Sequence, residues 1–252
     1  MTELAYLSSM DGAYTRSFRA QVVARPPGGV VLDRTFFYPT GGGQPNDLGT
    51  LRALSGSTDV PVVDVVKRGS TVVHRIGGPA LPRAAVPIGT EIAGSIDWAR
   101  RERHMRLHTS QHYLSARIFA RYGVRTRRAS RGGHEATIDL EGQLPPGALA
   151  TLAEDASSMS SDPRTVRIRE VPRVEWDRHP SARSGLVRLA SGVDPVRLIE
   201  IDGIDLCPCG GTHVRSTREV GGVEMRSISP LDGGGSRLRY ALTTEGGPTP
   251  RE

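Results

Sequence analysis

Apolar and polar residues alternate along the first third of the chain in short stretches that Gly, Ser, Asp and Pro separate. An alternation with a period of two residues is typical of strands that bury one face. It occurs, together with short apolar runs, at residues 14–37, 49–54, 60–66 and 71–76. We therefore predict a small β-barrel-like domain over residues 1–95.

The longest pattern with a helical period lies at residues 97–122. Leu107, Gln111, Leu114 and Ile118 recur at the spacing of one helix face, and Gly123 is expected to end the helix. A second helix is predicted at 145–159. Strands are predicted at residues 136–140, 164–174, 197–201, 222–228 and 237–243.

These elements predict an α+β protein. An α/β domain over residues 96–245, with a mostly antiparallel sheet and the long helix, follows the barrel-like domain, and residues 246–252 form a polar tail. The first residues lack the apolar core of a signal peptide, and no apolar run reaches the length of a membrane span. We expect a cytoplasmic protein without a membrane partner.

The charge balance favours a polyanionic partner. Lys and Arg total 33 against 27 Asp and Glu, and Arg dominates the basic residues. Arginine suits bidentate phosphate contacts, although genomic base composition also explains its abundance. The only two cysteines, Cys207 and Cys209, are one residue apart, so a disulfide between them would be strained. A reducing compartment and a metal role fit them better.

Two groups of metal-binding residue types stand far apart in the sequence. His104, His108 and His112 follow one another at intervals of four residues, which places them on one face of the predicted helix. Cys207, Cys209 and His213 surround a Gly-Gly turn. Thiolate and imidazole together suit Zn²⁺ better than Mg²⁺ or Ca²⁺. A metal bound by both groups would join the helix to this turn.

Three segments resemble a known family. Residues 108–112 (His-Thr-Ser-Gln-His) and 209–214 (Cys-Gly-Gly-Thr-His-Val) resemble the zinc motifs of the AlaX proteins, which are freestanding relatives of the editing domain of alanyl- and threonyl-tRNA synthetases. Residues 97–114 and 37–45 resemble the same family and occur in its order. The length resembles the medium-sized AlaX class.

The resemblance implies a Zn²⁺-dependent hydrolase that cuts the aminoacyl ester at the 3′ end of a mischarged tRNA. It implies zinc ligands at His108, His112, Cys209 and His213. His104, Cys207 and Thr212 would lie beside the ligands. His104 is alternatively a solvated helix residue, and Cys207 a small buried filler. Zinc would either activate water or anchor the substrate amino group, and the sequence leaves both open.

Substrate contacts are expected from two places. Thr109 and Gln111 flank the ligands on the helix, although Gln111 is equally well explained as a buried structural amide. Gly42, Gly43 and Gln44 could offer backbone N–H groups to the substrate, and a tight turn is the alternative. These five residues are the predicted catalytic group.

Arginines flank the predicted site. We expect contacts with acceptor-stem phosphates from Arg101, Arg125, Arg127, Arg128 and Arg131, with a solvated charged face as the alternative. Residues 125–134 depart from the AlaX pattern, and residues 233–237 match it only loosely. Both segments could line the substrate site, so these departures bear on which substrate the protein binds.

The family points to serine, or glycine, wrongly attached to alanine-specific tRNA. A threonyl or threonine-analogue ester is the runner-up, in a protein that protects a cell from a toxic amino acid. Three rival functions are a zinc-stabilised tRNA-binding module without catalysis, a zinc hydrolase of small esters or amides, and a thiol enzyme using Cys207. Protein partners and the oligomeric state do not follow from the sequence.

Overall fold

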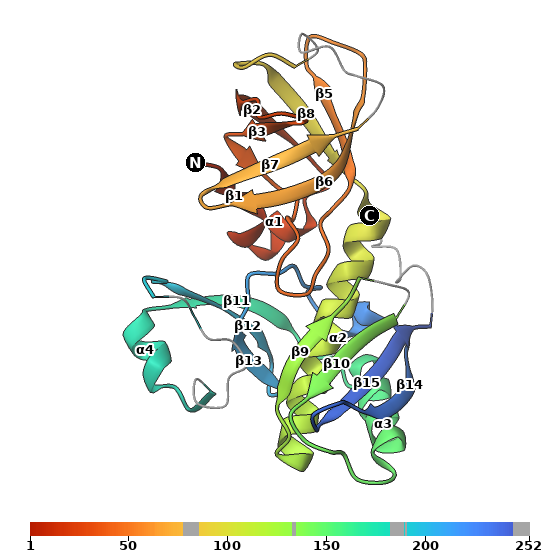
Figure 1. Ribbon diagram of the computed structural model, residues 1–252. Coiled ribbons are helices and arrows are strands. Elements are labelled where there is room, and N and C mark those ends of the chain that lie inside the picture. Colours follow the sequence, from red (N-terminus) through yellow and green to blue (C-terminus); the bar gives the residue numbers. More distant parts are fainter. Residues whose placement is uncertain (78–85, 133–134, 182–188, 190, 244–252) are drawn as a thin grey trace. The chain divides into compact units, whose positions relative to one another are not determined.

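The computed structural model describes residues 1–77, 86–132, 135–181, 189 and 191–243 (Figure 1). The chain folds as two compact units, Met1–Glu102 and Arg103–Glu252. The division falls a few residues after residue 95, where the alternating pattern was expected to end. The predicted polar tail at 246–252 lies outside the described residues, and the assignment of functional domains stays a prediction.

The first unit is built around a closed barrel of six strands. Their order around the barrel is β2 (Ser17–Ala24), β3 (Gly29–Leu32), β7 (Thr71–Ile76), β6 (Val60–Arg68), β5 (Gly49–Ala53) and β8 (Glu91–Ile96). The alternating residues of β2, Phe18, Ala20 and Val22, are buried and join an apolar core with Leu51 and Ile92. The burial of this face is what the period-two pattern predicts.

The chain reaches the barrel through a short N-terminal segment. β1 (Glu3–Leu4) pairs in parallel with β4 (Arg34–Thr35), and the 3-10 turn η1 (Ala5–Leu7) and α1 (Met10–Tyr14) follow. The Ser9 side chain accepts a hydrogen bond from the Gly12 N–H and so caps α1.

The long helix α2 covers Trp98–Tyr122. The Arg100 N–H donates to the Asp97 side chain at its start. At its end Gly123 has a φ of 66° and its N–H donates to the Phe119 carbonyl, the left-handed termination at which glycine is favoured. Residues 104–115 of this helix are all buried, although many of them are polar.

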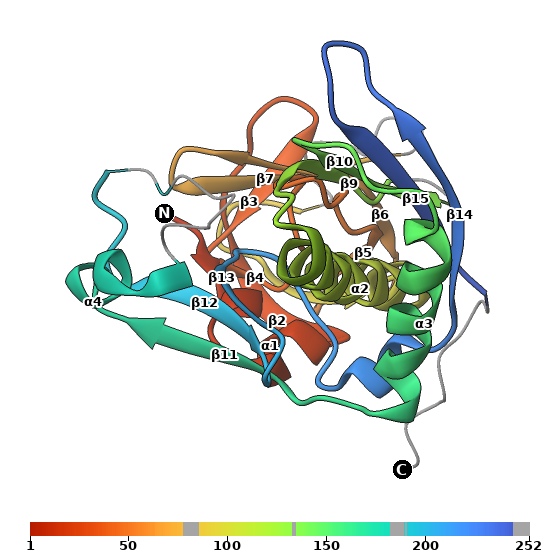
Figure 2. The ribbon, with the colours of Figure 1, turned by 90° about the horizontal axis from the view of Figure 1, so that it is seen from below.

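In the second unit, α2 lies along a four-stranded antiparallel sheet (Figures 1 and 2). The strand order is β14 (Val223–Pro230), β15 (Ser236–Leu242), β10 (Glu135–Leu140) and β9 (Thr126–Ser130). The buried Tyr240 hydroxyl of β15 donates to the Leu107 carbonyl of α2. Helix α3 (Ala148–Ser161) packs on β14. The Tyr240 contact ties the sheet to the buried middle of α2.

A second antiparallel sheet consists of β11 (Val166–Val171), β12 (Val196–Ile201) and β13 (Asp205–Pro208). Residues 164–174 were predicted as one strand, but β11 ends at Val171 and α4 (Arg173–Arg178) begins at once, burying Trp176 against the sheet. The 3-10 turn η2 (Thr217–Val220) follows β13. The α+β class with mostly antiparallel sheets is confirmed. Within the described residues no helix is both long and apolar enough to span a membrane.

Candidate metal centre

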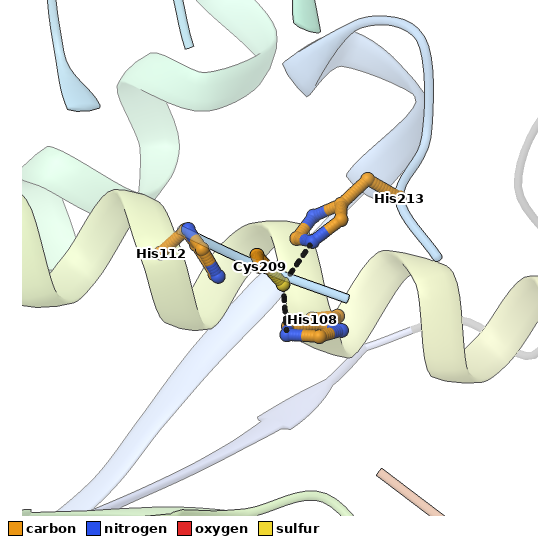
Figure 3. A group of neighbouring side chains, drawn as sticks. All are labelled: His108, His112, Cys209 and His213. Carbon is orange, nitrogen blue, oxygen red and sulfur yellow. Dashed lines mark hydrogen bonds between the residues drawn. The ribbon is translucent and has the colours of Figure 1, made fainter. Parts of the chain in front are cut away.

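Helix α2 carries the first half of the centre. His108 and His112 lie on successive turns, and their ring centroids are 5.1 Å apart. Figure 3 shows both rings turned toward Cys209 and His213. Both imidazoles are buried. The spacing of four residues therefore places two nitrogen ligands on one helix face, as the sequence indicated.

Strand β13 and the turn after it carry the second half. β13 is fixed by its pairing with the buried strand β12, where Cys207 lies opposite Ile199. The Cys209 N–H continues this ladder by donating to the Arg197 carbonyl. The chain then turns through Gly210 and Gly211, and His213 comes back toward Cys209 (Figure 3).

The four side chains meet at close distances. The Cys209 Sγ atom is 3.5 Å from His108 Nε2 and 3.3 Å from His213 Nε2. One ligand atom from each of His108, His112, Cys209 and His213 lies within 4.8 Å of all the others. Three imidazoles and one thiolate form a donor set that Zn²⁺ binds tetrahedrally. The residues present therefore fit a zinc ion.

The charges of this group are strongly coupled. Burial, together with nearby cations, lowers the pKa of His108 and of His213 well below the usual value. Burial opposes the charge of His112 too, but its contacts, among them the hydrogen bond with the Asp205 carboxylate, outweigh it and raise the His112 pKa well above the usual value. Burial likewise opposes the Cys209 thiolate, but contact with His112 outweighs it and lowers the Cys209 pKa. A metal binds thiolates and neutral imidazoles, so these shifts suit binding by Cys209, His108 and His213, whereas His112 would release a proton on binding.

A second group of donors adjoins the first and shares His112. The Asp205 Oδ2 atom is 2.9 Å from His112 Nδ1, and the Cys207 Sγ atom is 3.2 Å from the same nitrogen. Burial raises the pKa of the Cys207 thiol to about 12. Cys207 therefore lies beside the predicted ligands, as expected, and stays a thiol at neutral pH.

Thr109, for which a substrate contact is predicted, connects the two halves of the centre. Its buried hydroxyl is 3.1 Å from His213 Nδ1 and accepts a hydrogen bond from the Val214 N–H. Thr212 is buried next to His213. His104 lies one helix turn before His108 and is only 2% exposed. The alternative that His104 is a solvated residue is therefore wrong.

Gln111 and Arg131 form a buried polar chain. Arg131 Nη1 donates to Gln111 Oε1 at 2.7 Å, and Gln111 Nε2 donates to the Ser115 hydroxyl at 3.0 Å. Thr126 also donates to Ser115. The Gln111 amide is thus engaged at both ends, which favours the structural alternative over substrate contact. Arg131 is only 1% exposed, so it does not suit the predicted contact with surface phosphates.

The glycine loop and Arg101 belong to the first unit. Gly41 and Gln44 exchange two backbone hydrogen bonds, and Gly42 and Gly43 have φ values of 55° and 82°. This is the tight turn given as the alternative, and the Gln44 N–H is used within it. Arg101 is fully buried, with its guanidinium on Asp47 and on the Ala13 and Phe36 carbonyls. Arg101 therefore does not suit a phosphate contact.

The remaining predicted RNA contacts lie at the surface. Arg125, Arg127 and Arg128 are exposed, on β9 and immediately before it.

Asp205 is the functional candidate that the sequence pattern missed. Asp205, Cys207 and Cys209 alternate along one strand face, and this Asp-x-Cys-x-Cys spacing is the signal that could have found it.

Comparison with known proteins gives a consistent result. Residues 9–100 match the family of tRNA synthetases class II (A), and residues 196–238 match the family described as the threonyl and alanyl tRNA synthetase second additional domain. The second match includes the Cys209 and His213 segment.

Curated relatives extend the match over the whole length. The chain is 31% identical to the alanyl-tRNA editing protein AlaX-M of Methanosarcina barkeri and 32% identical to that of Saccharolobus solfataricus, covering 96% of this chain and 99% of each relative. It is 34% identical to the alanine–tRNA ligase of Pyrobaculum neutrophilum, over 93% of this chain but only 26% of the ligase. The chain thus spans about a quarter of that ligase.

Proposed function

Because the chain belongs to the AlaX family of alanyl-tRNA editing proteins, we propose that it is a zinc-dependent hydrolase of mischarged aminoacyl-tRNA. The observation that carries this proposal is the convergence of His108, His112, Cys209 and His213. This convergence supports the proposal because it occurs in a chain that matches 99% of the length of two AlaX-M relatives. The proposed partner is the acceptor stem and 3′ aminoacyl end of a tRNA, in the cytoplasm.

The proposed reaction is hydrolysis of the ester between the amino acid and the terminal ribose. Bound Zn²⁺ would supply Lewis acidity, which polarises a carbonyl or lowers the pKa of a water to about 7. The chain's own residues hold this position. The Thr109 hydroxyl fixes the His213 ring, and the Arg131–Gln111–Ser115 chain secures the helix face beside His112.

Seryl-tRNA for alanine is the proposed substrate, with glycyl-tRNA for alanine as a second. Serine differs from alanine by a hydroxyl, and a site that hydrogen-bonds this group rejects the analogue lacking it. A role for the backbone of Gly42 and Gly43 in holding the ester stays a prediction. Gly42→Ala tests it, because a Cβ there meets no atom within 4 Å and strains only the positive φ.

One observation favours a second substrate. Arg131 lies within residues 125–134, which depart from the AlaX pattern, and its buried guanidinium contacts Gln111 next to His112. A changed residue this close to the centre is compatible with a different amino acid. Threonyl-tRNA, or tRNA charged with a threonine analogue, is therefore the alternative, in a self-protecting enzyme.

The decisive experiment is a deacylation panel. Alanine- and threonine-specific tRNAs, each charged with alanine, serine, glycine, threonine or a threonine analogue, are incubated with the purified protein. We expect rapid loss of seryl-tRNA for alanine, little loss of alanyl-tRNA, and inhibition by a chelator that zinc reverses. Tight tRNA binding without any deacylation would instead indicate a binding module, and hydrolysis of small esters alone a different hydrolase.

A further inference from the structure

His112 has a carboxylate beside one of its ring nitrogens. Its Nδ1 atom is 2.9 Å from Asp205 Oδ2, and the ring is also part of the group with His108, Cys209 and His213. A carboxylate on Nδ1 holds the proton on that nitrogen. Nε2 then offers a metal its lone pair once the metal has displaced the second proton.

We propose that Asp205 is a positioning residue that fixes the tautomer and orientation of His112, so that Nε2 faces the metal. This inference rests on the proposed metal centre and goes beyond the four ligands. Asp205 acts through His112 and contacts neither the metal nor the substrate.

The backbone around Asp205 supports this role. Asp205 begins β13 and pairs with Ile201 of β12, and Cys207 pairs with Ile199; both isoleucines are fully buried. The strand is therefore held by apolar packing that does not depend on the metal. The Asp205 side chain, 19% exposed, reaches His112 from a position set before the metal binds.

Cys207 competes for the same nitrogen but is the weaker partner. Its Sγ atom is 3.2 Å from His112 Nδ1 and comes from the same face of β13, two residues further on. A thiol is a weak acceptor, whereas an ionised carboxylate forms a charge-assisted bond of about twice the usual strength. Cys207 is thus a matched control for Asp205, because its side chain lies beside the same nitrogen but is a weaker acceptor.

The test is the zinc affinity of the full chain, measured by competition with a chromophoric chelator. Asp205→Ala should weaken zinc binding by roughly 10–100-fold, the usual effect of losing a partner behind a ligating histidine. Asp205→Asn, which keeps an acceptor oxygen but not the charge, should lose less. Cys207→Ala should stay within about threefold of the unmodified protein. Equal zinc affinity in Asp205→Ala and the unmodified protein would overturn the proposal.

A second measurement separates positioning from a general loss of stability. In the zinc-loaded protein labelled with ¹⁵N-histidine, His112 should show a protonated Nδ1 and a metal-bound Nε2. Asp205→Ala should lose the protected Nδ1–H signal while circular dichroism stays unchanged. Metal on Nδ1 would overturn the proposal, as would a second zinc ion per chain that requires Cys207. If the unmodified protein binds no zinc, the proposed function fails first.

Discussion

The barrel and the middle of α2 are both buried, but they are buried in opposite ways. The barrel cluster consists only of Val, Leu, Ile, Phe and Ala side chains, among them Phe37, Leu51 and Ile92. Residues 104–115 of α2 bury mostly polar groups, including three histidines, Arg106 and Gln111. One core excludes water from apolar surface, whereas the other satisfies polar groups by contacts with one another.

This difference indicates which kind of substitution should destabilise each region. Apolar burial stabilises by roughly 25 cal/mol per Å² and needs no ligand. A buried polar group that loses its partner costs about 1–3 kcal/mol, and more if it is charged. The barrel should therefore respond to changes in volume. The α2 region should respond to any change in partners, above all at the proposed metal centre.

The largest expected effect is that of removing the thiolate. Cys209→Ser replaces a soft ligand by a hydroxyl, so the purified variant should retain no stoichiometric zinc. Its deacylation should fall by more than the roughly 10–100-fold that partners behind the ligands are worth. Metal analysis and the seryl-tRNA assay measure both. Cys207→Ser is the control and should keep its zinc; one zinc per chain in Cys209→Ser would refute the ligand set.

A cavity in the barrel should act on stability alone. Leu51 is fully buried in the cluster, and Leu51→Ala should reduce the free energy of unfolding by about 3 kcal/mol. Urea titration of the full chain measures the change, and zinc content should stay at one per chain. Val63→Ala, at a side chain 51% exposed on β6, should change stability by less than about 0.5 kcal/mol. Loss of zinc in Leu51→Ala would show that the two regions are not independent.

The same contrast explains which parts of the fold the sequence predicts. β2, β5, β6 and β7 are near the predicted ranges because their alternation is strong. β8 was missed, since its centre is Gly94, which weakens the strand signal. That glycine is required by tertiary packing: a Cβ there would lie 2.5 Å from the Phe18 ring. A contact across 76 positions of chain is invisible to a local pattern.

In the centre, the sequence predicted which four side chains come together but not the contacts that their neighbours make. His108 and His112 were accessible to prediction because helical spacing places them together. Asp205 was missed because its partner His112 lies 93 residues away. Gln111, Thr109 and Arg131 were given substrate or phosphate roles because each has free donors or acceptors in isolation. In the fold those groups hydrogen-bond one another or the ligands.

The buried His74 side chain makes the stability of the barrel depend on pH. His74 is buried between Thr35 and the Val30 carbonyl, and burial lowers its pKa from 6.5 to about 4 despite the Val30 bond. The folded state therefore excludes a proton that the unfolded chain accepts below pH 6.5. Stability is complete above that pH and falls as pH drops toward 4, by about 3 kcal/mol over the whole window.

Urea midpoints at pH 7.5 and pH 5 measure this contribution of His74 to stability. The proposed metal ligands also titrate, so the informative quantity is the difference between the unmodified protein and His74→Asn. The variant should be less stable at pH 7.5 but should lose about 2 kcal/mol less on acidification to pH 5. An identical pH dependence in both proteins would contradict a neutral buried His74.

The smallest expected effect is on tRNA affinity. It tests whether particular arginines on the surface of the second unit contact RNA. Arg127 and Arg128 are exposed on β9, an edge strand of the four-stranded sheet. If both contact phosphates, Arg127→Ala with Arg128→Ala should weaken tRNA binding by about tenfold and reduce the salt slope by about 1.5. Arg167 and Arg169 are also exposed on an edge strand, β11, so their double alanine variant removes the same charge elsewhere. Filter binding between low and moderate salt distinguishes the pairs. Equal losses in both variants would mean that only net charge matters, and that β9 is no RNA-binding edge.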